Sequence, residues 1–124
     1  MRITQRKGDI AVSRAIASFT RLGFDVSLPF TESAAYDIIV DTGKELKKVQ
    51  VKFTNSGEVD LRRIHSNSSG YVVKKPKSGS YDWLYVLTGE NKEYLIKDNL
   101  FGRRSFKPRE NHILDNLKIR GEVA

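Results

Sequence analysis

Three polar residues of different chemistry, Asp37, Gln50 and Lys52, lie close together in this sequence. Apolar residues on both sides of a Thr-Gly-Lys turn predict a β-hairpin, with one strand over 36–41 and the other over 46–54. A carboxylate oxygen and an amide oxygen are ligands that a hard cation such as Mg²⁺ accepts, and a neighbouring lysine orients a water or binds a phosphate. These residue types therefore indicate metal-assisted chemistry on a phosphate ester.

The pairing of the two predicted strands decides whether these side chains meet. Side chains alternate across a strand, so Gln50 and Lys52 share one face. An even loop centred on the Gly-Lys pair of the turn places Asp37 opposite Gln50, with Lys52 as the diagonal neighbour. Opposed residues lie about 4.5–5.5 Å apart at Cβ, and a long side chain spans the diagonal. The hairpin thus predicts one convergent acid, amide and amine.

The order of these residues and of their flanks resembles the core of the PD-(D/E)xK nucleases, in the variant where glutamine replaces the second acid. The matching segments, in chain order, are Lys7-Gly8-Asp9-Ile10-Ala11, Leu22-Gly23-Phe24-Asp25-Val26, Leu28-Pro29-Phe30, Asp37 and Val49-Gln50-Val51-Lys52. That order is similar to the small endonucleases associated with group I introns, and more distantly to archaeal Holliday-junction resolvases. The resemblance covers residues 6–54, with a weaker similarity at 81–86 and 94–96.

The resemblance implies a fold, an activity and a site. The fold is α/β with a restriction-endonuclease-like core, a central mixed β-sheet flanked by helices. The activity is that of a Mg²⁺-dependent DNA endonuclease, homing-endonuclease-like or junction-resolvase-like, in which Mn²⁺ can substitute. Asp37 and Gln50 then hold the metal together with the backbone carbonyl of Val51, and Lys52 serves the attacking water and the phosphate.

The first helix lacks an acid that such nucleases place against the sheet. The alignment puts Val12 where the relatives carry glutamate, and Asp9 and Ser13 lie one turn apart beside the apolar stripe. Asp9 is either an accessory residue that reaches the site through a water, or an N-cap or first-turn acid favoured by the helix dipole. This departure and the glutamine at position 50 leave a second hypothesis open, an inactive DNA-binding module or assembly protein with the nuclease fold.

Composition favours a polyanionic partner, and we expect DNA rather than a membrane. The 124 residues carry 22 Lys and Arg against 15 Asp and Glu, a net charge of +7. The candidate phosphate contacts are Arg62, Arg63, Lys74, Lys75, Lys77, Arg103 and Arg104. The absence of cysteine excludes disulfides and thiolate metal sites. We expect a cytoplasmic, nucleoid-associated protein, and a homodimer or higher homo-oligomer, because one such site cuts one strand.

The remaining pattern predicts a single domain over 1–124. A helix over 9–22 ends at Gly23, which suits a left-handed cap, and a half-buried strand over 24–30 ends or lies at an edge because of Pro29. The further predicted elements are short strands at 58–64 and 71–73, a basic loop at 74–80, an apolar strand at 81–88 paired with 93–97, a helical turn at 98–101, a loop at 102–108 and a helix near 109–118. Aromatic residues at 81, 83 and 85 are expected on one strand face, as core or interface residues.

Overall fold

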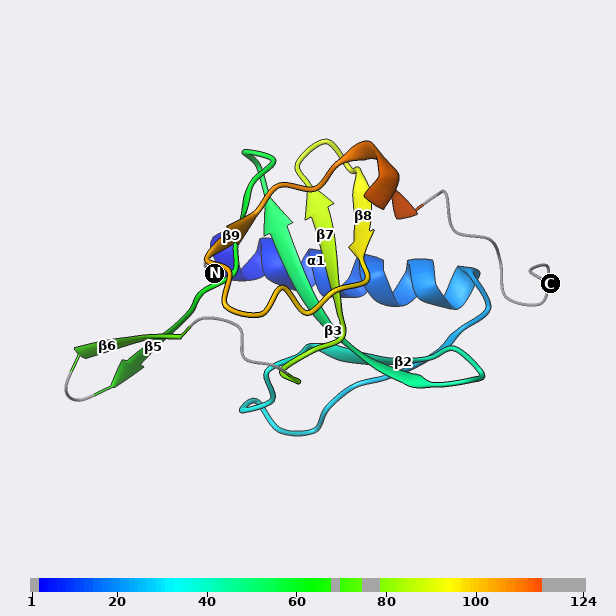
Figure 1. Ribbon diagram of the computed structural model, residues 1–124, viewed down its shortest axis with the longest axis horizontal. Helices are drawn as coiled ribbons and strands as arrows, with labels where there is room; N and C mark the ends of the chain where they lie inside the picture. Colours follow the sequence, from blue (N-terminus) through cyan, green and yellow to red (C-terminus); the bar gives the residue numbers. More distant parts are fainter. Residues whose placement is uncertain (1–2, 68–69, 75–78, 115–124) are drawn as a thin grey trace.

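The computed structural model describes residues 3–67, 70–74 and 79–114. One long helix packs against one face of a five-stranded sheet, and two smaller strand pairs lie outside that sheet (Figure 1). The elements are α1 (Ile3–Arg21), β1 (Asp25–Ser27), β2 (Ile38–Asp41), β3 (Leu46–Thr54), β4 (Val59–Asp60), β5 (Arg63–Asn67), β6 (Gly70–Lys74), β7 (Trp83–Thr88), β8 (Glu93–Ile96), β9 (Ser105–Phe106) and a 3₁₀ turn, η1 (Glu110–His112). The α/β class with a central mixed sheet is confirmed.

The sheet has the strand order β1-β2-β3-β7-β8. Its only parallel pair is β3 with β7, and the chain between these two strands carries β4 and the β5–β6 hairpin, which projects away from the sheet (Figure 1). The edge position predicted from Pro29 is confirmed, but β1 ends already at Ser27. Leu28 and Phe30, expected on the half-buried face, are therefore exposed.

Helix α1 begins at Ile3, six residues before the predicted start at Asp9. A glycine inside a helix costs only about 1 kcal/mol relative to alanine, so Gly8 does not stop it. The Lys7 ammonium lies 5.6 Å from the ring centroid of Phe53 and fastens this first part of the helix to β3. The helix end is as predicted, because Gly23 has a φ of 90° that a side chain disfavours.

The core has one cluster on each face of the sheet. Under α1, Phe19 is fully buried and its ring centroid lies 6.2 Å from that of Trp83 and 6.0 Å from that of Tyr85. On the other face Leu84 and Val86 pack with residues of the β4 and β9 segments. Tyr81 belongs to this second cluster, so the expectation that it shares a face with Trp83 and Tyr85 is wrong. All three aromatic side chains are buried, which makes them core residues rather than interface residues.

The segment after β8 departs most from expectation. Residues 98–101 form a turn with Leu100 at a φ of 52°, not a helical turn, and the predicted loop at 102–108 contains β9. Of the helix expected near 109–118, the structure describes only the short η1 and two following residues; 115–118 lie outside the described residues. In the part of the chain that the structure describes, no helix is both long and apolar enough to cross a bilayer.

A buried carboxylate ties the helix to the sheet. The Tyr85 hydroxyl donates to Glu93 Oε2 at 2.7 Å, and Ser18 Oγ donates to the same oxygen. The Arg14 guanidinium lies 3.3 Å from Glu93 Oε1. Burial and the hydrogen bond to Glu93 raise the pKa of Tyr85 far above its ordinary value, so its hydroxyl is always a donor here. This network joins α1, β7 and β8.

Tyr85→Phe is expected to lower the free energy of unfolding by about 1.5–3 kcal/mol, because it removes a hydrogen bond to a buried charged group. Tyr81→Phe is the matched control. Tyr81 is also buried, and its hydroxyl has no hydrogen-bond partner among the described residues, so its loss should change stability by less than about 0.5 kcal/mol. Urea unfolding followed by circular dichroism measures both, and equal effects would refute this account of the network.

Candidate active site

The pairing of β2 with β3 follows the register expected from the turn. Ile38 lies opposite Val49 and Asp41 opposite Leu46, which centres the loop on its Gly-Lys pair. Asp41 Oδ1 accepts the backbone N–H of Gly43 at 2.8 Å, and Gly43 has a φ of 91°. Asp41 therefore fixes the turn, and through the turn it fixes the pairing on which the site depends.

Asp37 lies just before β2 and is attached to β3 twice. Its backbone N–H donates to the carbonyl of Val49 at 2.9 Å, and its Oδ2 accepts the backbone N–H of Val51 at 2.7 Å. These two bonds bracket Gln50, the residue between them on β3. The half-buried carboxylate is thus held against the segment of β3 that contains Gln50, just before the paired residues of β2 begin at Ile38.

The Val51 carbonyl points to the same edge of β3 as this carboxylate. On the side of β3 that faces β7, the carbonyl of Lys48 accepts the N–H of Asp82 at 2.8 Å, and the carbonyl of Thr54 accepts the N–H of Gly89 at 3.1 Å. The backbone groups of the even-numbered residues of β3 therefore point toward β7. Backbone groups alternate along a strand, so odd-numbered residues of β3 bond toward β2. Because β2 begins at Ile38, its ladder does not reach the carbonyl of Val51.

Gln50 and Lys52 lie on the face of the sheet opposite α1. Val49 and Val51 are buried in the cluster under the helix, and alternation turns the two polar side chains between and after them to the other face. Both polar side chains are half-buried. Their neighbours on β7 are Leu84 and Val86 of the second cluster, which give the site an apolar wall.

Asp60 is a residue of this region that sequence reasoning missed. Its Oδ1 and Oδ2 accept from Arg62 Nε at 3.0 Å and Nη2 at 2.9 Å. The hydrogen bonds from Arg62 lower the pKa of Asp60 to about 2, and the charge of Lys52 adds to this shift. The sequence gives no signal for it, because Asp60 approaches Lys52 only when the chain after β3 folds back. Arg62, expected to contact phosphate, is held by Asp60 in this structure.

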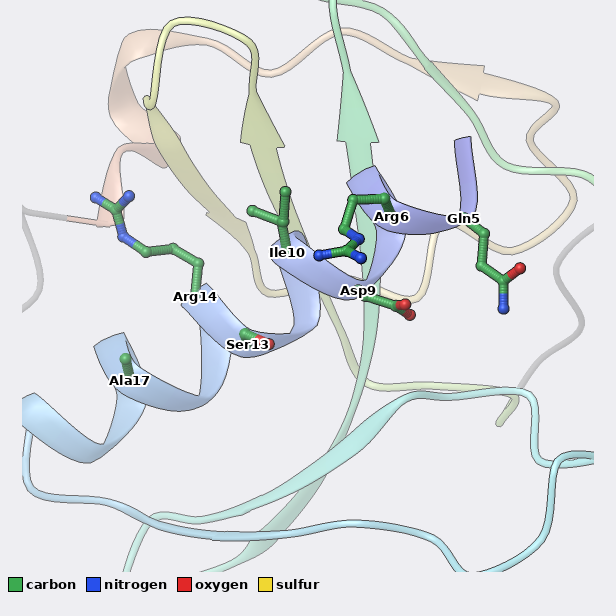
Figure 2. A pocket seen from close by; sticks show the side chains of 7 residues that line it. All are labelled: Gln5, Arg6, Asp9, Ile10, Ser13, Arg14 and Ala17. Carbon is green, nitrogen blue, oxygen red and sulfur yellow. The ribbon is translucent and has the colours of Figure 1, made fainter. Parts of the chain in front are cut away.

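The two candidate helix residues lie apart from the hydrogen bonds that attach Asp37 to β3. Figure 2 shows Asp9 and Ser13 on the exposed side of α1, lining a shallow hollow of about 680 Å³ built from that helix alone. The alternative that Asp9 caps the helix is wrong, because α1 begins six residues earlier. Val12 is half-buried against the core, so an apolar side chain stands where the resemblance implies glutamate.

The remaining predicted phosphate contacts fall in different places. Arg103 and Arg104 are exposed, in the segment between β8 and η1. Arg63 and Lys74 are paired in the β5–β6 hairpin by their backbones, and their side chains are not described. Lys75 and Lys77 lie outside the described residues.

The candidate oxygen donors are one carboxylate, one side-chain amide and one backbone carbonyl. Asp37 is bonded to the backbone of Val51, and Gln50 directly precedes Val51 on β3. Within residues 3–67, 70–74 and 79–114, no three His, Cys, Asp or Glu side chains group as a metal site. All three donors are hard oxygen ligands of the kind that Mg²⁺ takes, alongside waters and substrate phosphates. The donor set therefore fits a single hard divalent cation better than zinc or copper, whose preferred ligands include histidine and cysteine.

Comparisons with known proteins identify the family of the chain. A family model described as PD-(D/E)XK endonuclease matches residues 2–111. Among solved structures, the bacterial homing endonuclease I-Ssp6803I is similar with a TM-score of 0.73 and 26% identity, over 88% of this chain and 80% of that one. Hjc, a Holliday junction resolvase of Archaeoglobus fulgidus, is similar with a TM-score of 0.49 and 12% identity, over 90% of this chain and 99% of that one. No curated protein sequence matches the chain.

The low pKa of Asp60 has a pH-dependent consequence. Folding lowers this pKa from 3.8 to about 2, so the pair with Arg62 stabilises the fold fully above about pH 4 and loses this contribution as the pH falls toward 2. Arg62→Ala should return the midpoint toward 3.8, measured by NMR titration of the Asp60 carboxyl carbon. Arg104 lines a shallow pocket together with Asp60 and Arg62, so Arg104→Ala is the control and should leave the midpoint near 2. An unchanged midpoint in Arg62→Ala would contradict the assignment.

Proposed function

Because the chain belongs to the PD-(D/E)XK endonuclease family, we propose that it is a DNA endonuclease that hydrolyses phosphodiester bonds with a divalent metal ion. The observation that carries the proposal is the Asp37 carboxylate, bound to Val51 N–H beside Gln50 at the point where β2 begins. The similarity to I-Ssp6803I supports a homing-endonuclease-like activity as the finer form of the proposal.

Asp37, Gln50 and the Val51 carbonyl would hold the metal, with Mg²⁺ as the expected ion and Mn²⁺ as a substitute. A divalent cation supplies neutralising charge for the phosphate and lowers the pKa of a bound water. The hydrogen bond from Val51 N–H fixes the orientation of the Asp37 carboxylate, as supporting contacts do for metal ligands generally. Gln50 adds an oxygen without a charge, so Asp37 supplies the only side-chain negative charge of this donor set.

Lys52 would orient the attacking water and stabilise the charge that develops on the phosphate. It lies two residues after Gln50 on the same face of β3, with Val86 as its neighbour on β7. Asp60 lies near enough for the two charges to attract, and this attraction helps to hold the ammonium on the site's side of the sheet. One such site cleaves one strand, so we propose that a homodimer or higher homo-oligomer acts on duplex DNA.

Substitution of Lys52 distinguishes an active endonuclease from an inactive DNA-binding module. Lys52→Ala should reduce nicking of supercoiled plasmid in Mg²⁺ or Mn²⁺ by about 10²–10⁴-fold, because it removes charge stabilisation and water positioning. Lys47→Ala is the matched control, since Lys47 lies on the same strand and pairs with Glu45 of the turn. Nicking by Lys52→Ala at the rate of the unmodified protein would refute the assigned role. Binding without nicking by the unmodified protein in either metal would favour the inactive module.

Asp37→Asn separates the structural role of this residue from its chemical role. The asparagine oxygen still accepts the N–H of Val51, so the melting temperature should change little, while loss of the charge should abolish Mg²⁺-dependent nicking. Asp37→Ala should abolish nicking and also cost about 1–3 kcal/mol, because the Val51 N–H loses its acceptor. Thermal unfolding and plasmid nicking are the two measurements. Full activity of Asp37→Asn would show that its charge is not needed.

A further inference from the structure

We propose that the hollow enclosed by the chain from β8 to η1 is a second DNA-contact site, which binds phosphodiester backbone outside the cleavage site; the identity of its ligand rests on the proposed function. The hollow has a volume of about 760 Å³ and is lined by residues 96–112 only, all beyond the segment that holds the candidate catalytic residues. Arg103 was a predicted phosphate contact, and the hollow now gives it a defined setting.

The charge of this hollow is positive. Arg103, Lys107 and Arg109 line it with exposed side chains. Lys97 lines the hollow too, but its ammonium lies 5.3 Å from the ring centroid of Trp83, so we do not count it among the cations that face the ligand. Asp98 is the acid of the lining, and its Oδ1 accepts the N–H of Leu100 at 3.0 Å. Three cations around one concavity attract a polyanion and release its counterions on contact.

Aromatic rings fix the position of one cation and part of the wall. The guanidinium carbon of Arg103 lies 5.0 Å from the ring centroid of Phe106, and that ring lies 5.5 Å from the ring of His112. A guanidinium over a ring keeps its N–H donors in its own plane, available to phosphate oxygens. Because it is already positioned, less side-chain entropy is lost when it binds.

His112 adds a neutral donor to this wall. Its Nδ1 accepts the backbone N–H of Arg109 at 3.0 Å, which assigns the ring proton to Nε2. Burial, and then the charge of Arg109, lower the pKa of His112 below its ordinary 6.5. At neutral pH the imidazole therefore donates a hydrogen bond without adding a charge, and the electrostatic attraction comes from the three cations.

The hollow lies on the same face of the sheet as Gln50 and Lys52. Ile96 and Leu100 of its lining pack in one cluster with Leu84 and Val86, the β7 neighbours of those two residues. In Figure 1 the segment from β8 to η1 crosses in front of β3 and β7, with α1 behind them. Adjacent strands are about 4.8 Å apart, so two strand spacings separate β3 from β8. A DNA segment engaged at Lys52 can therefore reach this hollow across the same face of the sheet.

Charge reversal tests this site. The variant Lys107→Glu/Arg109→Glu is compared with Lys44→Glu/Lys92→Glu, which makes the same change in net charge at exposed lysines of the β2–β3 and β7–β8 turns. Fluorescence anisotropy measures the affinity for a short DNA duplex in buffer without divalent metal, over a range of salt concentrations. The hollow variant should bind at least about 10-fold more weakly, with a slope of log K against log salt shallower by about 2. The control should keep the slope of the unmodified protein.

The milder Lys107→Gln should make the slope shallower by about 1, and circular dichroism checks that every variant is folded. Equal slopes and affinities for the hollow variant and the control would overturn the site. The nicking assay tests the proposed nuclease function separately from this DNA-contact site. A protein that binds through the hollow but never nicks plasmid is no nuclease and keeps this site, whereas one that nicks and binds normally after the reversal lacks it.

Discussion

The site depends on one hydrogen bond, from the backbone N–H of Val51 to the carboxylate of Asp37. β3 continues beyond the end of the β2 ladder, so its next backbone groups on that side have no strand partner. Buried backbone groups need partners, and the carboxylate meets this need at Val51 with a bond of 2.7 Å. The same bond aims the carboxylate along the edge to which the Val51 carbonyl points. This one contact thus gives the Val51 N–H a partner and also positions a candidate metal ligand.

The two faces of the sheet have different roles. The face under α1 is apolar around Phe19, and the buried carboxylate of Glu93 links the helix to β7 and β8. The other face carries Gln50 and Lys52 at one end of the second cluster, and the basic segment after β8 covers the rest. Rigid packing behind the sheet holds the polar residues in place, and the charged surface in front is where a phosphodiester substrate makes contact.

Much of the site could be predicted from local chemistry. The turn at Gly43 sets the register of β2 and β3, and this register brings Asp37 next to Val49 and Val51, so a short stretch of sequence was enough. The helix begins six residues before the predicted Asp9, because the cost of Gly8 inside a helix is small and the contact of Lys7 with Phe53 holds the first turns against β3. Leu28 is exposed although the hydrophobic alternation continues through it, because the β1 ladder already ends at Ser27.

Contacts between residues that are far apart in the sequence could not be predicted from local sequence patterns. Asp60 meets the charge of Lys52 only through the return of the chain after β3, and Phe106 pairs with Val59 across a separation that no periodicity encodes. The basic residues after β8 were recognised by type, but the concavity that gathers Arg103 with Lys107 depends on how the chain from β8 to η1 folds. Residue chemistry indicated a function, and tertiary pairing decided which residues share a surface.

NMR line broadening by Mn²⁺ tests the central claim most directly, because the paramagnetic ion reports where a divalent cation binds. At substoichiometric Mn²⁺, the amide signals of Ile38 and Val51 should broaden first, while those around Asp9 on the outer side of α1 persist longer. This result places the cation at the edge where Asp37, Gln50 and the Val51 carbonyl converge. Broadening that begins around Asp9, or that spreads evenly over the chain, would contradict the account.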